Sequence, residues 1–131
     1  MNTATATAPK TWEEMTHEER VRQGLRICEG WQFSTIEQAR MFGLDPADVL
    51  NKEHLAKLLI DAKNDDIEQR AGSVSAIGAR LSSAFTSPDK QSEWMDQRFM
   101  CFGNRSFRTI LTGGKVDDMK WAHHELVCMM T

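Results

Sequence analysis

The sequence lacks the features that mark membrane and secreted proteins. No apolar run approaches the ~20 residues that span a bilayer, and the N-terminus has neither an apolar signal core nor a basic lead. The three cysteines, Cys28, Cys101 and Cys128, are widely spaced and belong to no paired motif. An odd number of isolated thiols predicts a reduced, cytoplasmic protein without a disulfide framework.

The sequence also has little that is typical of an enzyme. No glycine-rich phosphate loop follows a strand, and no nucleophilic serine elbow is present. His124 and Cys128 have the i, i+4 spacing that metal ligands use, but two ligands do not make a site. We therefore predict a protein that is not an enzyme and that has no metal site and no cofactor. The net charge of −3 indicates no polyanion partner, so any DNA binding must come from a local basic patch.

Helix start and stop signals follow one another along all 131 residues, and no alternating strand pattern is present. The sequence therefore predicts an all-α fold. We divide it into a disordered, low-complexity tail (1–15), a helix-turn-helix half (16–64), a long connecting helix (65–86) and a small helical partner-binding half (87–131).

The N-terminal half contains the outline of a helix-turn-helix. Thr16 and Glu19 form a capping box for a helix that runs to about Gly30, and Ser34 and Glu37 form a second one. The second helix has the small residue Ala39 four positions before Gly43, as close helix packing in this motif requires. Gly43 supplies the left-handed residue that ends it. A helix then restarts at Asp45-Pro46, with a break indicated near Asn51. The alternative is an ordinary helical hairpin without DNA contact.

The second half follows a long helix whose Gly72 and Gly78 indicate close approach of another element. Residues 87–89 begin a short helix, an aromatic segment covers 99–107, and Ser106 caps a helix that stops at Gly113-Gly114. The last helix begins near Val116 and is apolar up to Met130, which indicates packing or a partner.

The order of these elements resembles the Xre/MbcA/ParS-type antitoxins. The resemblance covers roughly residues 18–130 and rests on an ordered set rather than on one motif: 19–44 resembles the helix-turn-helix half, 67–85 the connecting helix, and 88–118 the toxin-binding half, including Phe102-Gly103-Asn104-Arg105. The resemblance implies an antitoxin that binds a RES-type, NAD-consuming toxin and often represses its own operon.

Two sets of candidate binding residues follow. For DNA, the second helix and the following segment offer Arg40, Asn51, Lys52 and His54, although Asp45, Asp48 and Glu53 lie among them and would repel phosphates. For a protein partner, aromatic, arginine and methionine side chains are the types enriched at interfaces. The candidates are Phe102, Arg105, Phe107, Arg108, Trp121, Met129 and Met130. Burial of the aromatic residues in the core is the alternative for most of that group.

We therefore predict an antitoxin-like protein that sequesters a protein partner and forms a homodimer through its apolar helix faces. One alternative is a DNA-binding transcriptional repressor whose C-terminal half only dimerises. The other is a stand-alone inhibitor of an unrelated protein target, built on the same fold.

Overall fold

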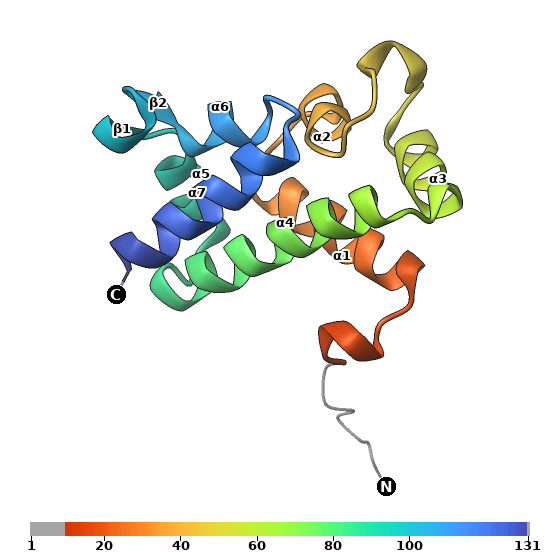
Figure 1. Cartoon of the computed structure of the whole chain (residues 1–131), viewed down its shortest axis with the longest axis horizontal. Helices are drawn as coiled ribbons and strands as arrows, with labels where there is room; N and C mark the ends of the chain where they lie inside the picture. Colours follow the sequence, from red (N-terminus) through yellow and green to blue (C-terminus); the bar gives the residue numbers. More distant parts are fainter. Residues whose placement is uncertain (1–9, 131) are drawn as a thin grey trace, which may run out of the picture.

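The all-α prediction is confirmed by a computed structural model, which describes residues 10–130 (Figure 1). Its α-helices are α1 (His17–Gly30), α2 (Thr35–Met41), α3 (Lys52–Ala62), α4 (Asp65–Ala84), α5 (Pro88–Met95), α6 (Phe107–Leu111) and α7 (Val116–Met129). Three short 3-10 helices are η1 (Trp12–Glu14), η2 (Pro46–Asp48) and η3 (Met100–Phe102). The only strands within these residues are β1 (Arg98–Phe99) and β2 (Arg105–Ser106), which form an antiparallel hairpin that the sequence did not predict.

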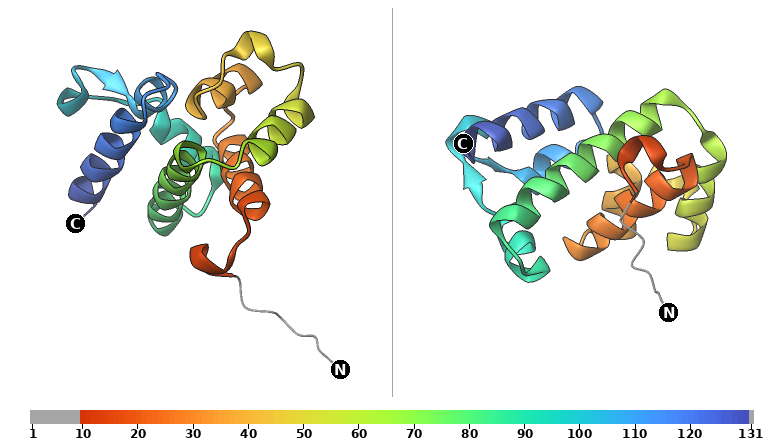
Figure 2. Two further views of the ribbon diagram at one scale, coloured as in Figure 1. Left: turned by 45° about the vertical axis from the view of Figure 1, so that its right-hand side comes forward. Right: turned by 90° about the horizontal axis from the view of Figure 1, so that it is seen from below.

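The long helix α4 lies in the middle of the molecule. It packs against α1 on one side and α7 on the other, as both views of Figure 2 show. Its buried side chains, from Ile67 to Leu81, follow the three- and four-residue steps of one helix face. The buried apolar residues of the chain form one cluster. The core therefore continues across the predicted boundary between residues 86 and 87.

Local capping sets most helix starts. The hydroxyl of Thr16 accepts from the N–H of Glu19, and that of Ser34 accepts from the N–H of Glu37, with both reciprocal bonds present. These two capping boxes are confirmed. The side-chain oxygens of Asn51 and Asn64 accept from the N–H groups of His54 and Ile67 and so cap α3 and α4. Ser106 caps α6 as predicted.

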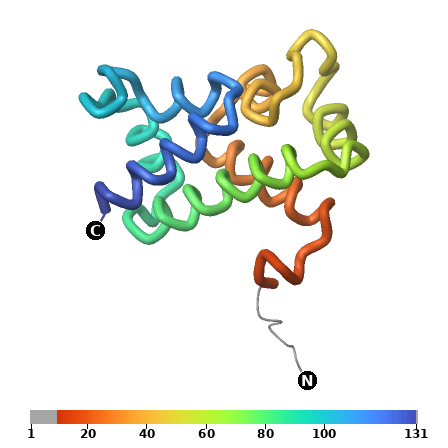
Figure 3. Tube along the Cα trace, in the orientation of Figure 1, coloured from red at the N-terminus to blue at the C-terminus, as the bar shows by residue number. Residues whose placement is uncertain are grey.

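The segment after α2 differs from the predicted helix-turn-helix. Gly43 has the expected positive φ of 80°, and Ala39 is fully buried. However, the helix expected from Pro46 is a single 3-10 turn, and the next α-helix begins only at Lys52, beyond the break near Asn51 (Figure 3). The tight link between two helices is therefore replaced by a long connection over residues 42–51.

The predicted disordered tail is partly wrong. Residues 1–9 lie outside the described residues, but Trp12–Glu14 form η1, which has a capping box between Thr11 and Glu14. The guanidinium of Arg20 lies 5.0 Å from the centre of the Trp12 ring and donates two hydrogen bonds to the Trp12 carbonyl. None of the helices within residues 10–130 is long and apolar enough to cross a membrane.

Candidate partner-binding surface

The β1–β2 hairpin and its connection (residues 98–106, here the hairpin end) project from the body at the side opposite α3 (Figures 1 and 2). The chain turns at Gly103 and Asn104, both with positive φ. Met100 stands at the tip and is 87% exposed, and the neighbouring Cys101 is exposed as well. An unbranched apolar side chain that is held in water on a projecting element is available for contact with another molecule.

An aromatic cluster fixes the hairpin end to the body. Phe102 and Phe107 are fully buried, with ring centroids 4.6 Å apart. Trp121 of α7 packs edge-on against Phe102 at 4.9 Å, and Trp94 of α5 contacts Phe107 at 4.6 Å. The prediction that Phe102 and Phe107 contact a partner is therefore wrong, because the small C-terminal core needs both rings. Trp121 is only half-buried but belongs to the same cluster.

The hairpin end forms part of a concave surface, here called the arginine surface. It is lined by Asp96, Arg98, Asn104, Arg105, Ser106, Arg108 and Thr109. The predicted residues Arg105 and Arg108 thus do share a site. The side chain of Arg105 is exposed, and its Nε–H donates to the carbonyl of Phe102 at 2.8 Å, which orients the guanidinium.

Arg108 has a structural role at the inner side of this surface. Its Nε–H donates to Asp96 at 2.7 Å, one terminal amino group pairs with Glu37 of α2 at 2.9 Å, and the other donates to the carbonyl of Trp31 at 3.1 Å. Burial alone lowers the pKa of Arg108, but the hydrogen bonds and charges of Glu37 and Asp96 outweigh it and raise that pKa. The prediction that Arg108 reaches a partner is therefore wrong, since these contacts within the chain occupy its guanidinium.

The two C-terminal methionines have different positions. Met129 is 39% exposed at the end of α7, whereas Met130 packs against the core. His124 and Cys128 on the same helix are neighbours, with 3.8 Å between Nε2 and Sγ. Within residues 10–130, no cluster of three or more side chains of metal-ligand type is present.

The predicted DNA-binding residues mostly have local roles. Asn51 caps α3, and the Nδ1 atom of His54 accepts from the N–H of Leu50 at 3.0 Å. Lys52 forms an ion pair with Glu29 of α1 at 2.5 Å. These three residues lie together at the start of α3, whereas Arg40 is exposed on α2. The outer face of α3 combines both charges, because Lys57 pairs with Asp61 on the same helix.

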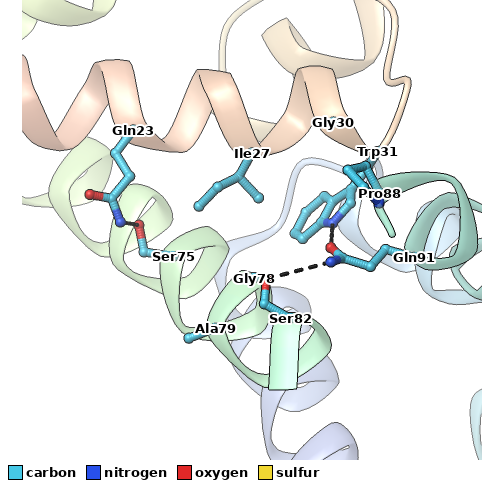
Figure 4. A pocket seen from close by; sticks show the side chains of 10 residues that line it. All are labelled: Gln23, Ile27, Gly30, Trp31, Ser75, Gly78, Ala79, Ser82, Pro88 and Gln91. Atoms are coloured by element: carbon cyan, nitrogen blue, oxygen red, sulfur yellow. Dashed lines mark hydrogen bonds between the residues drawn. The ribbon is translucent and has the colours of Figure 1, made fainter. Parts of the chain in front are cut away.

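A second concave surface lies between α1, α4 and α5 (Figure 4). The indole N–H of Trp31 donates to Gln91 at 3.2 Å, and the amide of Gln91 donates to the carbonyl of Phe85 at 3.0 Å. The other lining residues include Ile27 of α1 and small residues of α4 such as Gly78 and Ala79. These hydrogen bonds fix α5 to its neighbouring helices. The described residues that line this surface include no charged side chain.

The candidate residues taken from the sequence did not include Arg98, Met100 or Asn104. The dipeptide Gly103-Asn104 was an available signal, because such pairs are typical of hairpin turns, and it would have placed residues 98–106 on a projecting element. Comparisons of the chain with protein-family profiles, with curated protein sequences and with solved structures found no match.

Proposed function

We propose that this protein binds another protein through its hairpin end and sequesters it, as an antitoxin does. The observation that carries the proposal is Met100, whose side chain is 87% exposed at the tip of the projecting hairpin. Arg98 and Arg105 flank the tip. Methionine and arginine are enriched at protein interfaces, where the thioether adapts to an apolar surface and the guanidinium forms directed hydrogen bonds.

The order of sequence elements supports an antitoxin over other binding proteins. The hairpin end coincides with Phe102-Gly103-Asn104-Arg105, the segment that is similar to the toxin-binding half of the Xre/MbcA/ParS-type family. By that resemblance, the partner is a RES-type toxin that consumes NAD. A homodimer and autorepression of the operon belong to the same proposal.

Sequence-specific DNA binding is the weaker candidate on physical grounds. A recognition helix needs unpaired donors and few nearby carboxylates. At the start of α3, Lys52 is paired with Glu29, and Glu53 is exposed beside it. Tight binding to DNA through Lys52 would require this ion pair to break.

The test compares two exposed apolar residues at opposite ends of the molecule. Met100→Asp should reduce affinity for the native partner by about tenfold or more, because a charge would enter the centre of the interface. Leu50→Asp is the matched control, since Leu50 is 82% exposed in the connection before α3. Tagged parent and variants are used to capture the partner from the native host, and affinity is then measured with the purified partner.

Both variants should keep the parental helicity and melting temperature, because neither side chain is packed in the core. If Leu50→Asp abolishes capture and Met100→Asp does not, the interface lies in the N-terminal half and the proposal is wrong.

A further inference from the structure

We infer that the arginine surface binds one carboxylate of an acidic segment of the protein partner, through Arg98 and Arg105. This inference rests on the proposed function and specifies the chemistry of the partner. The arginine surface lies directly beside the tip that bears Met100, so an acidic side chain next to the apolar contact would reach it.

The charge balance leaves one positive charge to be neutralised. Arg98, Arg105 and Arg108 face the surface, and the carboxylates of Asp96 and Glu37 both bind Arg108. Three arginines against two carboxylates leave a single uncompensated positive charge. A concave site with such an excess attracts an anion and raises the on-rate of an acidic partner.

Most of the unused donors belong to Arg98 and Arg105. All three nitrogens of the Arg108 guanidinium already donate within the chain. Arg105 uses only its Nε–H, toward the carbonyl of Phe102, so its two terminal amino groups stay available. For Arg98, which is exposed on β1, the structure of residues 10–130 shows no side-chain hydrogen bond. A guanidinium offers a planar fork that fits a carboxylate with two parallel bonds.

A carboxylate fits this surface better than a phosphate. The site has a single excess positive charge once Asp96 and Glu37 are counted, and a phosphate group that carries nearly two negative charges would exceed it. A carboxylate with one negative charge balances the site. The amide of Asn104 lies on the same wall and adds a neutral donor without changing the charge.

The experiment uses the full chain and a hexaglutamate peptide as the probe. We expect the peptide to shift the arginine Nε–H NMR signals of Arg98 and Arg105 in a saturable way. The double variant Arg98→Gln/Arg105→Gln should bind it at least about tenfold more weakly. Arg26→Gln, on the exposed face of α1, is the control and should bind like the parent. Parental binding by the double variant, or tighter binding of inorganic phosphate than of the peptide, would overturn the inference.

Comparing capture of the protein partner by Met100→Asp and by the double variant tests this inference separately from the proposed function. Loss of capture in both Met100→Asp and the double variant supports both. Loss in Met100→Asp with parental capture by the double variant overturns the inference alone. Parental capture by both variants contradicts the proposed function and the inference together.

Discussion

At the residue scale, Arg108 shows how one side chain can hold three elements together. Its guanidinium joins α6 to Glu37 in the capping box of α2 and to Asp96 at the end of α5. It also lies 4.6 Å from the centre of the Phe33 ring. Glu37 thus has two roles, because it caps α2 through the N–H of Ser34 and neutralises Arg108. Removing one partner of such a shared, partly buried pair destabilises a fold more than removing one partner of an exposed pair, because the remaining charge is left without a counter-ion away from water.

Replacing this guanidinium should weaken the fold. We expect Arg108→Gln to lower the free energy of unfolding by about 1–3 kcal/mol, because Glu37 would lose its partner in a partly buried site. Urea unfolding at neutral pH measures the change. Arg22→Gln is the control, since Arg22 forms an exposed pair with Glu18 within α1, and it should cost less than about 0.5 kcal/mol.

The same variant should change the pH dependence of stability. Burial raises the pKa of Glu37, but the N–H of Ser34 and the charge of Arg108 outweigh it and lower that pKa. A carboxyl group with a lowered folded-state pKa stabilises the protein above its unfolded pKa of about 4.3, and this contribution is lost as the pH falls through the folded pKa. The stability difference between parent and Arg108→Gln should therefore shrink in acid. A constant difference down to about pH 3 would contradict this assignment.

At the element scale, the two glycines of α4 have different surroundings. A Cβ atom at Gly78 would lie 3.1 Å from two atoms of Ile27 on α1, so this glycine permits the close approach of the two helices that the sequence predicted. A Cβ atom at Gly72 would meet only the Trp12 ring, at an ordinary distance of 3.6 Å. The close packing prediction is thus confirmed at Gly78, whereas Gly72 is covered by η1 rather than by a helix of the core.

Because of this difference, we expect substitutions at the two glycines to change the free energy of unfolding in opposite directions. Gly72→Ala should raise the free energy of unfolding by about 0.5–1 kcal/mol, because alanine favours the helix and fits beneath Trp12. Gly78→Leu should lower it by about 1–3 kcal/mol, because the larger side chain displaces Ile27. Both values come from denaturant unfolding monitored by circular dichroism. Equal gains at both positions would show that α1 and α4 do not pack as closely as described.

At the scale of the whole molecule, Arg70 connects distant parts of the chain. It is a buried residue of α4, and one of its terminal amino groups donates to the carbonyl of Met41 at 3.1 Å and to that of Gly114 at 2.9 Å. One side chain therefore donates hydrogen bonds to a carbonyl group at the end of α2 and to another in the turn between α6 and α7. Its Nε–H also pairs with the exposed Asp66 at 2.9 Å. The N-terminal and C-terminal helices are thus fixed to the same central helix.

We expect Arg70→Met to lower the stability of the whole chain by about 2–4 kcal/mol, because two carbonyl groups lose their donor at positions far apart in the sequence. The transitions followed by helicity and by tryptophan fluorescence should move together, since one core joins both halves. Asp66→Asn is the control and should cost less than about 1 kcal/mol. Separation of the two transitions in the parent would show that the halves unfold independently.

The sequence by itself determined the fold class and most helix starts. Local features could be predicted because each depends on residues a few positions apart in the chain. They are the capping boxes at Thr16 and Ser34, the cap at Ser106 and the left-handed Gly43. The conformation after α2 could not be predicted as well, because an N-cap such as Asp45 followed by Pro46 can begin either a 3-10 turn or an α-helix.

Only the tertiary structure decided which candidate binding residues face solvent. Aromatic residues such as Phe102 and Phe107 are common both at protein interfaces and in protein cores. Packing against α5 and α7 places these two in the core. Arg108 meets Glu37 from 71 residues away, a pairing that no local pattern encodes. The physical reason is that capping depends on neighbours along the chain, whereas burial and ion pairing depend on neighbours in space.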